Sequence, residues 1–139
     1  HINYKAHLKK IISLNTSNPE KKAQNDLIAD MNKTRQVIEK AVGKIQLLRM
    51  PHGIDGPWIR DAAKQAGFVL VNWTYGTDWN PAPFEKQIPG YVKGIKPGGI
   101  ILLHDGWPKS DKSLAITEAL IHAAKEKGYE MVTVGELLK

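Results

Sequence analysis

The sequence predicts an α/β protein in which helices cover both faces of a parallel sheet. Short apolar runs recur at 45–48, 68–73 and 99–103, and amphipathic helix patterns separate them. Runs that lack alternation are typical of strands that are buried on both faces, as in a parallel sheet. A chain of 139 residues that is 42% hydrophobic supplies enough apolar material for one domain.

The first predicted element is a long amphipathic helix over residues 18–43. Asn18 is a suitable N-cap, Pro19 stands at the first helical position, and Gly43 ends the pattern. The apolar face of this helix consists of Leu27, Met31, Thr34, Ile38 and Ala41.

Strands and helices alternate after this helix. The apolar run at 45–48 precedes a helix at 57–66, whose apolar face consists of Ile59, Ala62, Ala63 and Ala66. The remaining predicted elements are a strand at 68–73, a helix at 83–95, a strand at 99–103, a helix at 111–127 and a strand at 130–134. The sequence thus predicts four strands in all, whereas a closed parallel barrel needs about seven or eight. The four strands therefore form either an open sheet or the later half of a barrel.

Composition excludes several classes of protein. No apolar run approaches the roughly 18 residues that a membrane helix needs. The chain has no cysteine, which excludes disulfides, thiolate metal sites and a cysteine nucleophile. The net charge of +6 would favour an anionic polymer, but many of the lysines stand beside glutamates in helical stretches, and no nucleic-acid motif is present. Nucleic acid is therefore not an expected partner, and anionic-polymer binding is the last-ranked hypothesis.

Charged and polar residues stand where the predicted strands end. Arg49 follows the first strand, Asp78 follows the second, and His104 follows the third. The carboxyl ends of parallel strands carry functional residues because their loops converge over one edge. A titratable histidine, a carboxylate to orient it and a permanent cation suit acid–base chemistry. Gly53, Gly76 and Gly106 suit either close approach to a ligand or ordinary turns.

Three ordered motifs resemble a known family: Arg49-x-Pro51-x-Gly53, Asp78-Trp79 and Leu102-Leu103-His104-Asp105. They are similar to the third, fourth and fifth motifs of the polysaccharide deacetylase family, the NodB-homology group or carbohydrate esterase family 4. The sequences around 66–73, 97–101 and 127–129 agree as well, so the likeness spans about 18–139. The resemblance implies that the chain is the C-terminal part of a distorted (β/α)7 barrel.

The resemblance also implies an activity, which is the hydrolysis of N-acetyl or O-acetyl groups on a polysaccharide such as peptidoglycan or chitin. A divalent metal, zinc in the first place with cobalt or manganese as alternatives, would polarise the acetyl carbonyl and activate water. His104 would be the general acid, Asp78 would hydrogen-bond its imidazole, and Arg49 would position a base aspartate. Family members of this kind suggest a secreted or cell-envelope location.

Substrate contacts are implied at five positions. Pro51, His52 and Gly53 would lie against the substrate, with the backbone at His52 helping to stabilise the oxyanion. Trp79 and Leu102 would form the wall of the pocket that holds the acetyl methyl group.

The chain departs from the family pattern at its beginning. The early Thr-Phe-Asp-Asp motif is absent, and the pair of metal-binding histidines four residues apart is not intact. His1 is interpreted either as the second of those histidines or as a terminus with no role. On the first interpretation the chain lacks its N-terminal part, is inactive alone, and leaves an open sheet that a missing segment or self-association would cover.

Two further departures lie in the motifs themselves. Tyr75 stands where the family usually has an aspartate, and we expect this to change only local support. His52 replaces an aromatic residue and could touch substrate or metal, but the resemblance implies that this position acts mainly through its backbone, so a structural role is preferred. A non-catalytic carbohydrate-binding module or pseudoenzyme on the same fold is the alternative to an active deacetylase.

Overall fold

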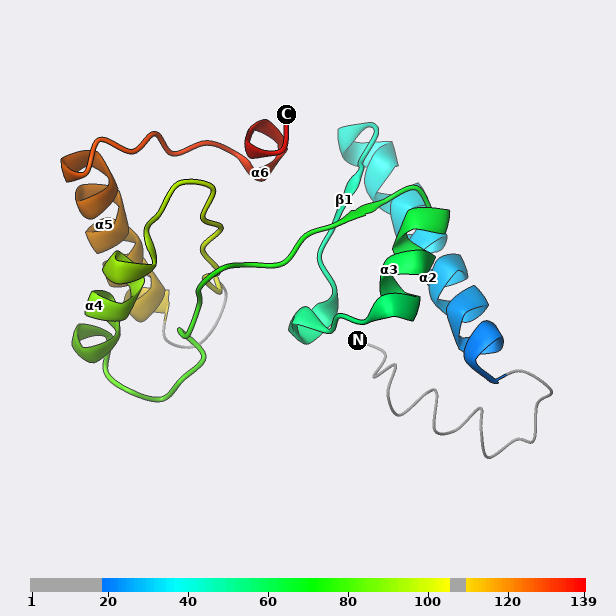
Figure 1. Cartoon of the computed structure of the whole chain (residues 1–139), viewed down its shortest axis with the longest axis horizontal. Coiled ribbons are helices and arrows are strands. Elements are labelled where there is room, and N and C mark those ends of the chain that lie inside the picture. The colour runs from blue at the N-terminus through cyan, green and yellow to red at the C-terminus, as the bar shows by residue number, and fades with distance from the viewer. Residues whose placement is uncertain (1–18, 106–109) are drawn as a thin grey trace. The chain divides into compact units, whose positions relative to one another are not determined.

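The computed structural model describes residues 19–105 and 110–139, which fall into two compact units (Figure 1). The first unit ends at Asn72, and the second runs from Trp73 to Lys139. Each unit has its own cluster of buried apolar side chains. In the described part of the chain, no helix is both long and apolar enough to cross a membrane.

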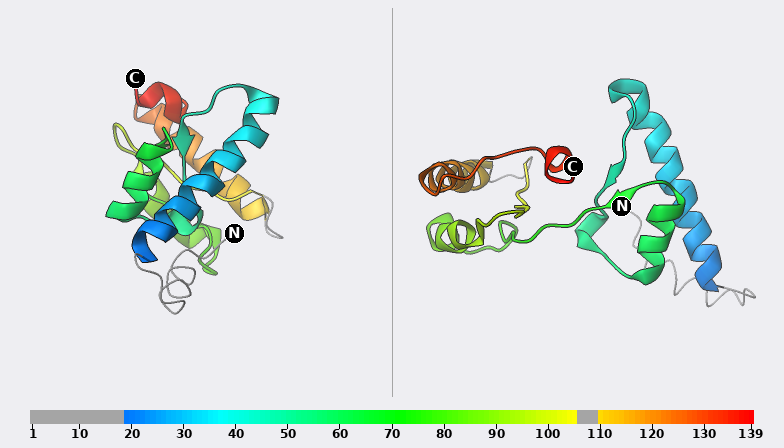
Figure 2. Two further views of the ribbon diagram at one scale, coloured as in Figure 1. Left: turned by 90° about the vertical axis from the view of Figure 1, so that its right-hand side faces the viewer. Right: turned by 45° about the horizontal axis from the view of Figure 1, so that its top comes forward.

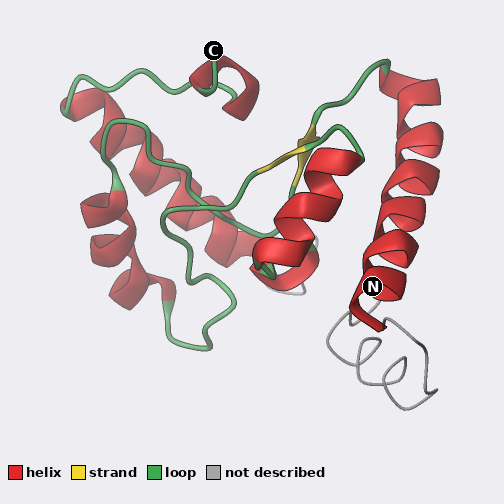
Figure 3. Ribbon diagram, turned by 45° about the vertical axis from the view of Figure 1, so that its right-hand side comes forward, coloured by secondary structure: helices red, strands yellow, loops and turns green. Residues whose placement is uncertain are grey.

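The first unit contains the helices α2 and α3 and a pair of short parallel strands. Its elements are α2 (Pro19–Val42), β1 (Leu47–Leu48), the 3-10 turn η1 (Pro51–Gly53), α3 (Pro57–Gln65) and β2 (Val69–Leu70). In the strand pair, which Figure 3 draws in yellow, Leu47 lies opposite Val69 and Leu48 lies opposite Leu70. The α3 helix packs against both α2 and β2, so this unit is a β-α-β crossover with an additional helix.

The core of the first unit confirms part of the predicted helix faces. All four apolar residues of the 57–66 pattern are buried, and α2 buries Leu27 and Met31. The later part of the α2 face is different, because Thr34, Ile38 and Ala41 are exposed. The α3 helix has 9 residues and α2 has 24. At about 1.5 Å per residue, α3 covers only part of the length of α2. Asn18 lies outside the described residues.

The second unit is organised by two packed helices, α4 (Phe84–Gly94) and α5 (Ser110–Glu126) (Figure 2). Tyr91 on α4 and Ile116 on α5 are both fully buried. Beside these helices, a parallel bridge joins Tyr75 to Ile101. The α/β class with parallel strand pairing is therefore confirmed, while the strands are much shorter than predicted.

The prediction of a final strand at 130–134 is wrong. Residues 130–133 have no regular structure, and α6 (Val134–Leu137) begins where the strand was expected to end. Thr133 caps this helix by accepting a hydrogen bond from the Glu136 backbone, and the Glu136 side chain accepts one from the Thr133 backbone. Such a capping box satisfies backbone N–H groups locally, whereas a strand needs a neighbour for the same purpose. The spacing of Thr133 and Glu136 was a visible helix signal.

Gly76 is required by a close backbone approach, and the neighbour is protein rather than ligand. A Cβ atom built at Gly76 would lie 2.7 Å from the Cβ and 2.9 Å from the carbonyl oxygen of Leu102. Leu102 donates its N–H to the carbonyl of Tyr75 at 2.9 Å, which holds the two segments together at this point. These segments lead directly to Asp78 and His104.

Replacing Gly76 with alanine is expected to lower the free energy of unfolding by about 1–3 kcal/mol, because the new methyl group would push against the Leu102 backbone. Gly56→Ala is the matched control. Its φ is 173°, and a Cβ atom there meets nothing within 4 Å. Urea unfolding followed by circular dichroism measures both variants, and equal losses of stability would contradict the close-approach argument.

Candidate active site

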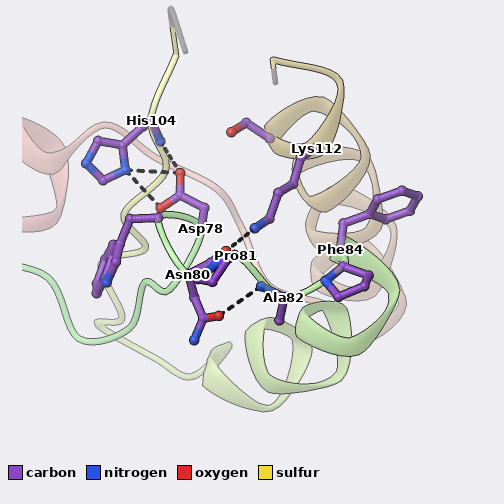
Figure 4. Close-up of a pocket in the computed structure, with 10 residues that line it drawn as sticks. Asp78, Asn80, Pro81, Ala82, Phe84, His104 and Lys112 are labelled. Atoms are coloured by element: carbon purple, nitrogen blue, oxygen red, sulfur yellow. Dashed lines mark hydrogen bonds and ion pairs between the residues drawn. The ribbon is translucent and has the colours of Figure 1, made fainter. Parts of the chain in front are cut away.

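Asp78 and His104 form a hydrogen-bonded pair in the second unit. The Nδ1 atom of His104 lies 2.9 Å from Oδ1 and 3.1 Å from Oδ2 of Asp78 (Figure 4). The backbone N–H of His104 also donates to Oδ2, at 2.5 Å. Because a carboxylate can only accept, Nδ1 carries a proton in this contact. Nε2 is then the ring nitrogen that can exchange a proton with a bound molecule.

The two partners differ in exposure, which divides their roles. The Asp78 side chain is 2% exposed, whereas that of His104 is 33% exposed. A buried carboxylate with two donors has a fixed position, and it fixes the orientation of the imidazole in front of it. The arrangement therefore presents an oriented acid–base group at a surface that a ligand can reach.

This pair borders a pocket of about 530 Å³. The pocket is lined by Asp78, Trp79, Asn80, Pro81, Ala82, Pro83, Phe84, His104, Lys112 and Ser113. Most of this lining is apolar, and the few polar groups are concentrated around Asp78 and Lys112, as is typical of small-molecule sites. Figure 4 shows the Lys112 side chain extending toward the 80–81 segment, where its Nζ donates to the carbonyl of Asn80 at 2.5 Å.

Trp79 offers an exposed aromatic surface at this pocket. Trp79 is 46% exposed. The Trp79 ring meets the His104 ring edge-on with centroids 6.0 Å apart, and it meets Trp73 in the same way at 6.4 Å. An exposed aromatic ring can cover the apolar face of a sugar, and the edge-on contacts with His104 and Trp73 hold this ring in place.

Two buried polar residues of α4 support the loop that carries Asp78, and the sequence analysis did not identify them. The Tyr91 hydroxyl accepts hydrogen bonds from the N–H groups of Thr77 and Asp78 at 2.8 and 2.9 Å. Gln87 donates from Nε2 to the carbonyls of Asn80 and Ala82 at 3.2 and 2.7 Å. The available signal was their spacing, since polar groups four residues apart share the face of α4 that also carries apolar core residues.

Tyr75, which departs from the family pattern, is accommodated by two glycines of α4. A Cβ atom at Gly94 would lie 3.0 Å from both Cβ and Cγ of Tyr75, and one at Gly90 would collide with the Tyr75 hydroxyl. The Tyr75 ring also packs edge-on against Tyr91 with centroids 5.0 Å apart. Tyr75 therefore packs tightly against α4, next to the pocket rather than in it.

The third-motif residues lie in the first unit. Arg49 is exposed directly after β1, and Pro51, His52 and Gly53 form η1. His52 has φ 58° and ψ 15°, a left-handed conformation that is unfavourable for any residue with a Cβ atom. The structure thus brings Asp78, Trp79 and His104 together at one pocket. The grouping of these residues with Arg49, Pro51, His52 and Gly53 stays a prediction.

Two other predicted positions have different outcomes. Leu102 lies two residues before His104, and its carbonyl oxygen accepts a hydrogen bond from Tyr91 at 3.3 Å. Gly106 and His1 are outside the described residues. Within 19–105 and 110–139, no group of three histidine, aspartate or glutamate side chains is placed to hold a metal ion. A catalytic zinc site normally has three protein ligands, so the described residues do not by themselves fit such a site.

Known proteins match both the sequence and the structure. A peptidoglycan-N-acetylglucosamine deacetylase of Bacillus cereus is 31% identical over 127 residues, which are 89% of this chain and 58% of the relative. A family 4 carbohydrate esterase from Streptomyces lividans, solved in complex with acetate, matches 79% of this chain with a TM-score of 0.65 and 26% identity. The chain is similar in sequence and structure to proteins of the polysaccharide deacetylase family. The resemblance drawn from its three motifs is confirmed.

A further comparison involves a protein that is named as a pseudoenzyme. A solved mutant of a carbohydrate esterase family 4 pseudoenzyme, with restored enzymatic activity, matches 84% of this chain with a TM-score of 0.71 and 25% identity. The chain covers 57% of the Streptomyces esterase and 42% of the pseudoenzyme. It therefore spans about half the length of the proteins it matches. A scan against models of protein families found no match.

The environment of Tyr91 predicts a pH dependence of stability. Burial raises the pKa of the Tyr91 hydroxyl above its ordinary value of 10.0, and the Asp78 carboxylate raises it further, against the lowering effect of the Thr77 and Asp78 N–H donors. With the folded pKa above the unfolded one, the stability from this group is fully present below about pH 10. It is lost as the pH rises through the folded pKa, because the unfolded chain releases its proton first.

We therefore expect the free energy of unfolding to fall more steeply with pH above about 10 in the unmodified chain than in Tyr91→Phe, which has no proton to release. Urea unfolding at several pH values between about 9 and 11 measures the two slopes. Lysine deprotonation affects both proteins and cancels in the comparison. Parallel profiles would show that the Tyr91 hydroxyl titrates as in the unfolded chain.

Proposed function

We propose that this protein is a metal-dependent hydrolase that removes acetyl groups from a polymer containing N-acetylglucosamine, such as peptidoglycan or chitin. The observation that carries the proposal is the contact between the buried Asp78 and the half-exposed His104 at the pocket. Similarity to deacetylases supports the reaction, and the Bacillus cereus relative supports peptidoglycan as the substrate. We also propose the family's (β/α)7 barrel for the whole domain and a secreted or cell-envelope location.

His104 acts as the general acid in the proposed reaction. Water adds to the acetyl carbonyl carbon, the carbon–nitrogen bond breaks, and the sugar nitrogen takes a proton from Nε2 of His104. Acetate and the free amine are the products. Donation from Nε2 requires a ring that is protonated on both nitrogens. Asp78 accepts the Nδ1 proton, with Nδ1 and Oδ1 2.9 Å apart, and so orients the ring for transfer to the leaving nitrogen.

The remaining roles are proposed from the family resemblance together with the positions of the residues. Arg49 would orient the base that deprotonates water, and the strained backbone at His52 would point an N–H group at the oxyanion. Pro51 and Gly53 shape that loop, and Trp79 and Leu102 would enclose the acetyl methyl group. The base and the ligands of the zinc, cobalt or manganese ion, His1 among them, would lie outside the described residues.

A second candidate is a carbohydrate-binding pseudoenzyme on the same fold. Two observations favour it: the solved neighbour that is named as a pseudoenzyme, and the exposed Trp79 ring beside His104 and Trp73. In this case the pocket would bind acetylated sugar without releasing acetate. The two candidates share a ligand and differ in turnover, so they are separated by measuring binding and acetate release on the same samples.

The enzyme hypothesis is tested by acetate release from acetylated chito-oligosaccharide and from peptidoglycan, using the protein at its native length with zinc or cobalt. We expect His104→Ala to lower kcat by about 10²–10⁴-fold, because the leaving amine loses its proton donor, and Asp78→Asn to lower it through the misoriented imidazole. His122→Ala, an exposed histidine of α5, is the control and should keep full activity. Unchanged turnover in His104→Ala would refute the proposed acid.

The binding hypothesis is tested by titrating the same oligosaccharide into the protein by calorimetry. Trp79→Ala should weaken binding about tenfold because the sugar loses a stacking surface worth about 1.4 kcal/mol, whereas Trp79→Phe should keep most of the affinity. Binding that depends on Trp79 with no acetate release under any metal would favour the pseudoenzyme. Binding that is insensitive to Trp79→Ala would place the sugar elsewhere.

A further inference from the structure

One oxygen atom connects the two segments that carry the acid–base pair. The Tyr91 hydroxyl accepts from the N–H groups of Thr77 and Asp78, and it donates to the carbonyl of Leu102 at 3.3 Å. Asp78 is itself one half of the pair, and Leu102 lies two residues before His104. Tyr91 is fully buried, so water cannot replace these bonds without opening of the unit.

The hydrogen bonds around this oxygen close a ring. From the Tyr91 hydroxyl the path runs to the Asp78 N–H, through the Asp78 carboxylate to the N–H and Nδ1 of His104, and back along the chain to the Leu102 carbonyl. Each bond in the ring restricts the others, because a shift of either segment must lengthen at least one of them. The distance between Asp78 and His104 is thus linked to the position of Tyr91.

Only a hydroxyl group fits this place in the ring. The group at this place must accept hydrogen bonds from two N–H groups and donate one to a carbonyl. A side-chain hydroxyl can do both, because it supplies one proton and two lone pairs. The neighbouring residue Gln87, one turn earlier on α4, binds the carbonyls of Asn80 and Ala82 beyond Asp78. Gln87 therefore fixes the pocket wall, while Tyr91 fixes the junction of the two segments.

We propose that Tyr91 is a positioning residue of the active site, whose hydroxyl sets the alignment of the His104 imidazole against Asp78. The residue does not touch substrate and acts only through the backbone of Thr77, Asp78 and Leu102. This inference rests on the proposed function for its catalytic consequence. The alignment itself is a property of the chain and is measurable without any reaction.

A purely structural role for Tyr91 is the competing explanation, and Tyr75 provides the matched control. Both tyrosines belong to the second unit, and their rings pack edge-on against each other. The Tyr75 hydroxyl is not part of the ring of hydrogen bonds that joins Asp78 to Leu102. Tyr75→Phe therefore removes a hydroxyl group from the same packed region and leaves the ring intact.

The experiment is nuclear magnetic resonance of the whole 15N-labelled chain, following the His104 ring N–H proton that is bound to Asp78. In Tyr91→Phe we expect this proton to exchange with water at least about fivefold faster, the change that corresponds to the loss of one hydrogen bond. Tyr75→Phe should leave the exchange rate unchanged. An unchanged rate in a folded Tyr91→Phe chain, or equal changes in both variants, would overturn the proposal.

A measurement on the unmodified chain keeps the test decisive if Tyr91→Phe does not fold. Release of the Tyr91 hydroxyl should free the Thr77 amide, the Asp78 amide and the His104 ring proton together, so their protection factors should agree within about threefold. Protection factors that differ by more than about tenfold would show that these three protons are not released by one opening event, which would contradict the proposal.

The catalytic arm is measured separately. In an active preparation, Tyr91→Phe should lower kcat about tenfold with little change in KM, and Tyr75→Phe should retain both constants. Loss of affinity without loss of kcat would refute the positioning role. If no preparation releases acetate while the exchange results hold, the proposed function fails and the alignment by Tyr91 stands.

Discussion

The burial of the Asp78 carboxylate is the constraint on which the site in the second unit depends. A charge that is removed from water must be compensated by donors at fixed positions, and unpaired burial would cost several kcal/mol. Here the compensation comes from the backbone N–H and the ring of His104. The same contacts that make Asp78 tolerable in the interior therefore orient the imidazole. When this unit folds and buries Asp78, the contacts that compensate the carboxylate also form the acid–base pair.

The α4 helix does more for the pocket than the predicted strands do. Its residues Gln87 and Tyr91 bind the backbone on both sides of Asp78, and Gly90 and Gly94 leave room for Tyr75. The side chains needed for this lie on neighbouring turns of the helix, so one element holds the loop, the bridge segment and the aromatic packing together. Substitutions on α4 outside the pocket are thus expected to reach the chemistry through the backbone.

The short parallel strand pair of the first unit has one exposed apolar face. Leu47 and Val69 lie opposite each other in the register and are 39% and 53% exposed, whereas Leu48 and Leu70 pack partly against the core. One face of this strand pair is covered by α3, and the apolar residues of the other face are accessible. Exposed apolar strands of this kind are stabilised by further strands or another layer.

Sequence alone indicated the family resemblance, the helices and the identity of the paired residues. Helix positions were predictable because caps, glycines and apolar periodicity are local, and α2, α3, α4 and α5 agree with their predicted ranges within one residue or so. Asp78 and His104 were identified because their motifs keep a fixed order along the chain. The predicted strand at 130–134 failed because a strand depends on a partner that no local pattern specifies.

Tertiary structure decided what those residues contact. The contact of Nδ1 with a carboxylate 26 positions away, the Leu102 backbone against Gly76, and the three hydrogen bonds of Tyr91 all join segments that are distant in sequence. The spacing of Gln87 and Tyr91 placed both on one face of α4 but did not indicate what the Tyr91 hydroxyl binds, since a tyrosine in an amphipathic helix is an ordinary core residue. Its role arises only when packing removes it from water, because its hydroxyl must then find partners within the protein.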